Sequence, residues 1–381
     1  MVRFNASLNL RLTLLVTVFT STAAVAQQAS LEATLDQLVE GGEIVAAQAV
    51  VGRGGRILVD HAVGVTVPGG SQKVDADTMF CIGSCSKPFA SAVVMSLVED
   101  DLLKLDRPVS DHMPAFGELI LRNGQPSLRA PTMKELLTHR SGIYSQKRGM
   151  TRRQAGWIRN FGLTLKESVD GIAGERLISQ PGSEYAYSGA GYCVAGRIAE
   201  VAAGESFESL LQERIAKPLA LTRTTYFPIA DNTNVAAGGI QGRVNPATPH
   251  LTKPELRLPL IGGSLYSTAQ ETALFLRMVA DRGRAGTNRV MQQRTWQTWT
   301  SRPYKHGNYG FGWLVAADSP APGSVTLSHN GSLASSRSRV VVIPKLGVYA
   351  VVHYTVSGPD PSVGGKIRTA MDRAVKNLAR K

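Results

Sequence analysis

The chain has 381 residues, 43% of them hydrophobic, and a formal net charge of +13. This composition is that of a soluble globular protein with a sizeable core, arranged as one large unit or as two lobes. Its three cysteines are an odd number, which excludes a full set of disulfides. The excess of basic residues would suit binding to anionic envelope polymers, but it would equally well serve only to keep the protein soluble.

Residues 1–26 have the pattern of a secretory signal peptide. Arg3 and Arg11 precede an uncharged apolar run, and small residues end at Ala26. The run is shorter than the ~20 residues that span a bilayer, so cleavage is favoured over a membrane anchor. We therefore predict a secreted or periplasmic protein, residues 27–381, with no transmembrane anchor after cleavage. Export and the lack of a binding motif argue against nucleic acid as a partner.

The first elements of the predicted mature chain are a helix and a hairpin. Residues 30–40 have helical periodicity. Residues 44–51 and 57–65 read as two strands joined by a glycine-rich turn. This hairpin is expected to begin a sheet.

Residues 80–101 predict a turn followed by a long buried helix that begins at Ser84. Ser84 is the only serine with a lysine three residues later, and this spacing brings Lys87 to the same helix face. A lysine can take the proton of a serine if burial lowers its pKa from about 10.4. The alternative is a helix-capping serine beside a solvated lysine.

The three cysteines, Cys81, Cys85 and Cys193, are expected to be small buried hydrophobic residues. Cys85 is an alternative nucleophile. It is less favoured because the next helical position points about 100° away from Ser84.

Residues 131–143 predict a short helix capped by Thr132 and ended by Gly142. His139 in this stretch is interpreted as a structural residue under the site floor rather than as a general base. The basic window 146–159 is interpreted as a solvated helix face, with contact to an acidic substrate or to the cell surface as the alternative.

Residues 180–196 form a loop rich in glycine and tyrosine that can present a phenol to a cleft. Tyr187, if close to the ammonium of Lys87, would have its pKa lowered from about 10 and could shuttle protons. The alternative is a core tyrosine with a satisfied hydroxyl. Further on, Ser267 or Thr268 is expected to cap a helix, with Glu271 completing a capping box.

The last pattern covers residues 325–354. The alternation of apolar and polar residues predicts a strand from Val325, a turn, a partner strand over 340–343, and a third strand over 348–354.

Three of these stretches, in this order, resemble the motifs of class C serine β-lactamases and their relatives: D-alanyl-D-alanine carboxypeptidases, D-aminopeptidases and β-lactamase-like carboxylesterases. The stretches are IGSCSKPF around Ser84, PGSEYAYSG around Tyr187 and the HNG of residues 329–331, where the superfamily has Lys-Thr-Gly or His-x-Gly. The segments LLTHRSGI, GGSLYST and YGFGW are also typical of it. The resemblance implies that Ser84 is acylated, that Lys87 is the base and that Tyr187 is the catalytic tyrosine.

The resemblance also implies a substrate-binding wall. Gly331 would let a substrate approach the strand edge, and the N–H of Ser332 would complete an oxyanion hole with that of Ser84. His329 would supply a weak positive field that depends on pH near 6.5. The chain departs from the pattern at Gly189, where the family usually has an asparagine that binds the lysine and the substrate amide.

The implied fold is α+β: an antiparallel sheet flanked by helices and built from both ends of the chain, plus a mainly helical lobe, roughly residues 80–260, with the site between them. The implied activity is that of an exported serine hydrolase acting on small esters, β-lactams or D-amino-acid cell-wall peptides, without a cofactor or metal. The alternative is a penicillin-binding-type envelope protein that binds such ligands but turns them over slowly.

Overall fold

The computed structural model describes residues 22–228, 234–240, 243–245, 255–319, 323–358 and 361–380. The predicted leader lies outside this part except for residues 22–26, which begin α1. The helices are α1 (Thr22–Glu40), α2 (Ser86–Glu99), α3 (Met133–Leu137), α4 (Arg152–Arg159), α5 (Leu165–Ala173), α6 (Gly189–Ala203), α7 (Phe207–Leu211), α8 (Ala269–Ala280), α9 (Gln293–Trp299) and α10 (Pro361–Arg380). The strands are β1 (Ile44–Arg53), β2 (Arg56–Gly64), β3 (Phe80–Cys81), β4 (Gly238–Ile240), β5 (Arg243–Asn245), β6 (Tyr266–Ser267), β7 (Arg284–Ala285), β8 (Asn288–Arg289), β9 (Leu314–Ala317), β10 (Val325–Leu333), β11 (Ser336–Ile343) and β12 (Val348–Val356).

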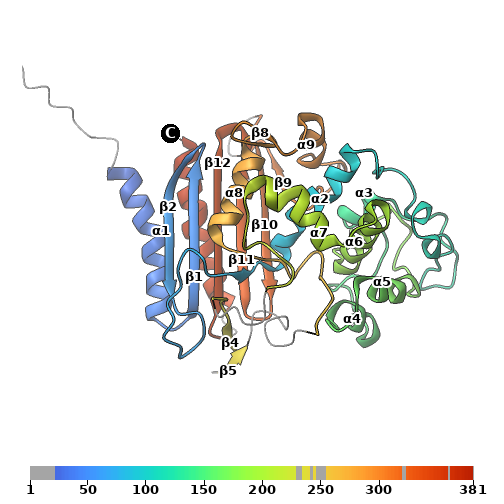
Figure 1. The fold of residues 1–381 in the computed structure, drawn as a ribbon, viewed down its shortest axis with the longest axis horizontal. Coiled ribbons are helices and arrows are strands. Elements are labelled where there is room, and N and C mark those ends of the chain that lie inside the picture. Colours follow the sequence, from blue (N-terminus) through green and yellow to red (C-terminus); the bar gives the residue numbers. More distant parts are fainter. Residues whose placement is uncertain are drawn as a thin grey trace, which may run out of the picture.

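The main sheet has six strands in the order β2-β1-β12-β11-β10-β9, all paired antiparallel. The N-terminal hairpin joins the C-terminal strands through β1 and β12, where Ala47 lies opposite Tyr354 (Figure 1). The predicted hairpin and the three predicted C-terminal strands are confirmed, with β11 starting four residues earlier than expected. The two ends of the chain therefore build one sheet.

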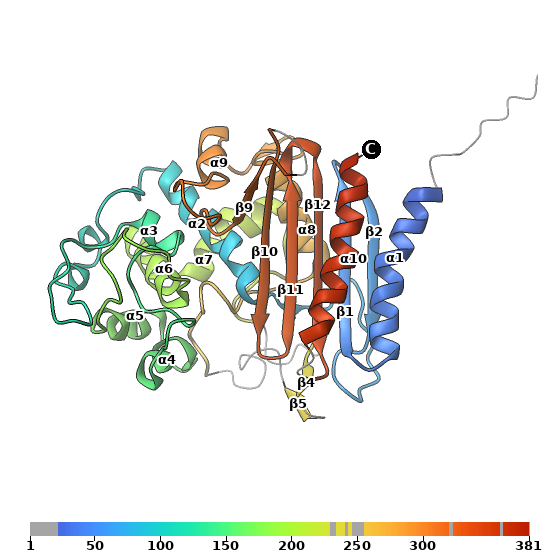
Figure 2. The same cartoon turned by 180° about the vertical axis from the view of Figure 1, so that it is seen from behind.

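Helices cover both faces of this sheet. The helix α8 crosses one face (Figure 1), and α10 and α1 pack side by side on the other (Figure 2). Every residue of β12 is buried, which explains why its sequence, VYAVVHYTV, is almost continuously apolar instead of alternating.

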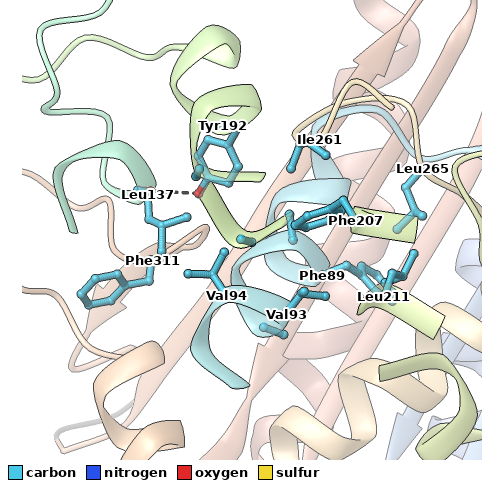
Figure 3. Packing of buried hydrophobic residues seen from close by; sticks show 14 of the residues in the cluster. Phe89, Val93, Val94, Leu137, Tyr192, Phe207, Leu211, Ile261, Leu265 and Phe311 are labelled. Carbon is cyan, nitrogen blue, oxygen red and sulfur yellow. Dashed lines mark hydrogen bonds between the residues drawn. The ribbon is translucent and has the colours of Figure 1, made fainter. Parts of the chain in front are cut away.

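The helices α2 to α7 form the other part of the fold, on the side of β9 and β10 (Figure 1). The helix α2 is buried on nearly all sides, as its sequence predicts, because it lies between these helices and the sheet. Figure 3 shows this packing: Val94 lies near Leu137, and the Tyr192 hydroxyl donates to the Leu137 carbonyl oxygen at 2.8 Å. The observed architecture confirms the predicted fold class.

The predicted N-caps of α3 and α8 were right, whereas other local predictions for these two helices were wrong. Thr132 caps α3 through a full capping box with Glu135, as expected of that residue. The helix, however, ends at Leu137, so the prediction that Gly142 ends it was wrong. Gly142 has a φ of +76°, and a Cβ there would lie 2.2 Å from the Ser179 carbonyl oxygen. A glycine is needed at this position for that close approach.

The predicted capping box at α8 was also wrong. Thr268 accepts a hydrogen bond from the backbone N–H of Glu271, so it is the cap. The Glu271 carboxylate instead accepts hydrogen bonds from the backbone N–H groups of Thr222 and Arg223. The Glu271 carboxylate is therefore engaged in a long-range contact, which the local sequence does not reveal, and is not used in a capping box.

Candidate active site

Ser84 lies on the 3₁₀ turn Gly83–Cys85, immediately before α2, and not on α2 itself as predicted. The side chain is half-buried. It lines two neighbouring cavities, one of about 550 Å³ and one of about 280 Å³. Ser84 is therefore open to an entering molecule.

Lys87 is enclosed. Only 2% of its surface is exposed, and its Nζ atom lies 3.4 Å from Ser84 Oγ and donates to the Gly262 carbonyl oxygen at 2.7 Å. Burial lowers the pKa of this amine to about 7. The alternative of a solvated lysine is thereby excluded.

The segment around Gly262 is held beside Lys87 by short strands. The strand β3 pairs with β6, and the Ile82 N–H donates to the Leu265 carbonyl oxygen at 2.9 Å. A Cβ at Gly262 would lie 2.9 Å from Lys87 Nζ. Gly262 is the first residue of the GGSLYST stretch, and this close approach to the lysine gives the glycine a role that the sequence did not indicate.

Tyr187 joins the pair. Its ring centroid lies 4.6 Å from Lys87 Nζ, and its hydroxyl is hydrogen-bonded to Ser84. Burial nevertheless raises the pKa of Tyr187 to about 12, against the opposing effect of that hydrogen bond. The expectation that the lysine would lower this pKa was wrong, because a buried amine with a pKa near 7 carries little charge above neutral pH.

His139 lies behind Tyr187, with 4.2 Å between the two ring centroids. The ring is 1% exposed, and its Nδ1 atom accepts the backbone N–H of Ser188 at 3.0 Å. Burial, with a smaller effect from Lys87, lowers its pKa well below the ordinary value. These contacts agree with the predicted structural role, in which His139 supports the loop that carries Tyr187.

His329 lies on β10, and both of its ring nitrogens are engaged. Nδ1 lies 2.8 Å from the Asn330 carbonyl oxygen, to which it must donate. Nε2 then accepts the Tyr309 hydroxyl, at 2.9 Å. Burial lowers the pKa of His329 to about 3, so the predicted pH-dependent positive field was wrong: the imidazole is neutral at physiological pH.

Gly331 and Ser332 lie where β10 meets the Ser84 turn. A Cβ on Gly331 would lie 2.0 Å from the Ile82 carbonyl oxygen, and one on Gly83 would lie 2.3 Å from the Ser332 nitrogen. Both Gly331 and Ser332 line the smaller cavity together with Ser84. Close packing of β10 against the Ser84 turn therefore explains why residue 331 is a glycine. The oxyanion-binding role of the Ser332 N–H stays a prediction.

Gln146 is the residue that sequence analysis missed. Its Oε1 atom accepts the N–H of Gly189 at 2.9 Å, and a Cβ on Gly189 would lie 2.2 Å from its Nε2 atom. The amide of Gln146 thus occupies the space that an asparagine at position 189 would need. Gln146 also lines the larger cavity with Ser84 and Lys87. Its position depends on a contact across 43 residues, which no local pattern reveals.

The basic window around α4 is only partly the solvated face that was predicted. Arg148 and Arg153 form ion pairs with Glu184 and Glu175, at 2.8 Å and 2.7 Å. Lys147, in contrast, lines both cavities. This part of the window therefore faces the site.

The three cysteines are buried, as expected, and they are also free. Burial raises the pKa of Cys81 and Cys193 to about 12 and that of Cys85 still further. The alternative of Cys85 as a thiol nucleophile is therefore rejected. Within the described ranges, no three histidine, cysteine or acidic side chains are grouped to hold a metal ion. No described helix is long and apolar enough to cross a membrane.

Comparison with known proteins agrees with this geometry. The family model described as Beta-lactamase matches residues 31–374. Penicillin-binding protein 4 of Amycolatopsis lactamdurans is 28% identical over 308 residues, which is 77% of each chain. Esterase EstB of Burkholderia gladioli is 30% identical over 201 residues, about half of each chain. Among solved structures, EstCE1, a hydrolase with promiscuous acyltransferase activity, superposes with a TM-score of 0.77 at 21% identity, over 92% of this chain and 99% of that one.

Proposed function

The chain belongs to the beta-lactamase family of serine hydrolases, and we propose that it cleaves its substrate through an acyl-enzyme on Ser84. One observation carries the proposal: a half-buried serine facing a cavity lies 3.4 Å from a lysine whose buried amine has a pKa of about 7. A lysine of ordinary pKa would be protonated at neutral pH and could not act as a base.

The first step is proton transfer from Ser84 to Lys87. A neutral amine has two N–H groups and one lone pair. The N–H that binds the Gly262 carbonyl oxygen orients the amine, and the lone pair is then free for the serine hydroxyl. Ser84 Oγ attacks the substrate carbonyl, and the backbone N–H groups of Ser84 and Ser332 receive the oxyanion.

The second step is departure of the leaving group. Tyr187, protonated because its pKa is about 12, donates its proton to the leaving oxygen or nitrogen and is reprotonated by Lys87. Water then attacks the acyl-enzyme, with the same groups acting in reverse, and frees Ser84. Tyr187 thus acts as a proton donor and relay, and Lys87 alone as the initial base.

The substrate class proposed is small esters, with β-lactams and D-amino-acid peptides as the related alternatives. The larger cavity has an apolar lining that includes Ile158, Phe161, Leu260 and Leu333, which suits an apolar acyl group. The side-chain amide that the resemblance assigns to position 189 comes here from Gln146, and its Oε1 atom already accepts the Gly189 N–H. This leaves less acceptor capacity for the N–H of a peptide substrate, which favours esters.

A chromogenic ester and a chromogenic cephalosporin, assayed on the wild type and on Ser84→Ala, test the proposal. The wild type is expected to hydrolyse at least one, and the variant neither, because the attacking oxygen has been removed. Equal rates for the two proteins would exclude Ser84 as the nucleophile.

A penicillin-binding-type protein with slow turnover is the second candidate, favoured by the 28% identity to penicillin-binding protein 4. Intact-mass spectrometry separates the two. A slow binder would retain an adduct of one penicillin per chain for hours, whereas a hydrolase would release it. In either case, loss of the adduct in Ser84→Ala would place it on this serine.

We also propose that the protein is exported, because residues 1–26 carry the charged, apolar and small-residue segments of a leader. N-terminal sequencing of protein recovered from outside the cytoplasm should begin at Gln27. In that compartment its basic charge would favour association with anionic envelope polymers.

A further inference from the structure

The two cavities beside Ser84 are lined with an uneven set of charges. Among the described residues that line them, none is an aspartate or a glutamate. The basic side chains are Lys147, Arg159 and Lys87, and the buried amine of Lys87 is largely neutral above about pH 7. Only Lys147 lines both cavities, and in the smaller cavity it is the only charged side chain of the described lining. A bound molecule therefore meets positive charge without a competing acid.

Among the described residues, Lys147 has no ion-pair partner, unlike the adjacent Arg148. Arg148, the next residue, is neutralised by Glu184 and also donates to the Tyr185 carbonyl oxygen. In the described part of the chain, no carboxylate lies within 4.0 Å of Lys147 Nζ. The ammonium instead lies 5.3 Å from the centroid of the Tyr187 ring. It is an exposed cation next to the reacting groups.

The charge of Lys147 reaches His329 in the wall of the smaller cavity. Burial is the main reason for the lowered pKa of His329, and the charges of Lys87 and Lys147 add to it. The opposite wall offers no cation of its own, because the His329 imidazole is neutral with both nitrogens occupied. An anionic part of a substrate thus has one positive partner shared by both cavities.

We propose that Lys147 binds a carboxylate carried by the substrate, so that the enzyme prefers esters with an acidic group over neutral esters of the same shape. The inference rests on the proposed hydrolase function and names its substrate class more narrowly. Lys147 would act on binding and specificity, and not on the proton transfers. An ammonium is a compact point charge that pairs with a single anionic oxygen without a fixed geometry.

The test uses chromogenic esters that differ by one remote charge. One pair is 4-nitrophenyl hydrogen adipate and its methyl ester, which place the acid in the acyl part. A second pair is 3-carboxy-4-nitrophenyl hexanoate and 4-nitrophenyl hexanoate, which place it in the leaving group. Both positions are tested because Lys147 lines both cavities.

The variants are Lys147→Met, which removes the charge, and Lys147→Arg, which keeps it. Arg152→Met is the matched control, because Arg152 is an exposed cation of the same segment that lines neither cavity. We expect Lys147→Met to lower kcat/KM for the acidic ester of at least one pair by about three- to fivefold, the upper part of the range for an exposed ion pair. Its neutral partner should change less than about twofold. Lys147→Arg should retain the preference, and Arg152→Met should resemble the wild type.

A wild-type measurement gives an independent check that needs no variant. The preference for the acidic ester should shrink as salt is raised, because screening weakens an exposed ion pair. The inference is overturned if Lys147→Met lowers the acidic and neutral esters equally, or if neither pair shows a preference in the wild type. If the wild type hydrolyses neutral esters no faster than Ser84→Ala does, the proposed function itself fails, which is a different result.

Discussion

The segment that runs from the Ser84 turn into α2 and the strand β10 each contribute one buried base to the same site, and burial has opposite consequences for the two. Lys87 starts from an ordinary pKa of 10.5 and is lowered to about 7. His329 starts from 6.5 and is lowered to about 3. Desolvation penalises the charged form of both. It brings the lysine into the range of a useful base and removes the histidine from that range.

Their hydrogen bonds reinforce the difference. The amine of Lys87 has one backbone acceptor and the nucleophile beside it, so a lone pair remains available. The imidazole of His329 is closed by Asn330 on one side and Tyr309 on the other. A histidine in an active-site motif is therefore not a base by virtue of its type alone. In the proposed mechanism Lys87 accepts and donates protons, whereas His329 forms part of the cavity wall.

Replacement of Lys87 is expected to have the largest effect on activity. Lys87→Met keeps most of the length and the apolar stem of the side chain but has no basic nitrogen to take the serine proton. We expect kcat/KM for a neutral chromogenic ester to fall by about 10²- to 10⁴-fold, the usual contribution of a general base. A melting curve of the variant controls for folding. Activity within about threefold of the wild type would exclude Lys87 as the base.

A second change tests whether the two regions depend on their close contact. Gly331→Ala would place a Cβ 2.0 Å from the Ile82 carbonyl oxygen, so β10 and the Ser84 turn must separate. We expect the free energy of unfolding to fall by about 1–3 kcal/mol, as for other overpacked sites. Gly365→Ala is the control, because a Cβ there meets no atom within 4 Å. An unchanged denaturation midpoint in Gly331→Ala would contradict the close contact.

The smallest effect is expected when the histidine is replaced. In His329→Gln, the amide oxygen can accept the Tyr309 hydroxyl, so only the fit of the buried wall changes. We expect about 1 kcal/mol of lost stability, and a kcat/KM that follows the same pH dependence as the wild type. A shift of the pH midpoint in this variant would show that His329 titrates during the reaction.

The sequence predicted the parts of this site that depend on short spacing. The Ser84–Lys87 pair follows from one helical turn, the N-terminal hairpin from alternation and a glycine turn, and the Thr132 cap from a local motif. The convergence of Tyr187 on Lys87 came from the family resemblance, because 100 residues separate the two and periodicity says nothing about such a contact.

The parts that the sequence did not predict depend on burial and on distant neighbours. The raised pKa of Tyr187 and the lowered pKa of His329 both result from desolvation, which cannot be inferred from residue type. The amide of Gln146 fills the space beside Gly189 only in the folded chain. The absence of an asparagine was visible in the sequence, but its replacement by a side chain from another segment was not.

The central claim is that a buried Lys87, neutral above about pH 7, activates Ser84. The most direct test is the pH dependence of kcat/KM for a neutral ester, with the rate of Ser84→Ala subtracted as background. Because the base works only when deprotonated, the account predicts low activity in acid and a single rise with a midpoint near 7. No alkaline fall is expected below about pH 10, because Tyr187 keeps its proton until about 12. A flat profile from about pH 5.5 to 9 would contradict the account.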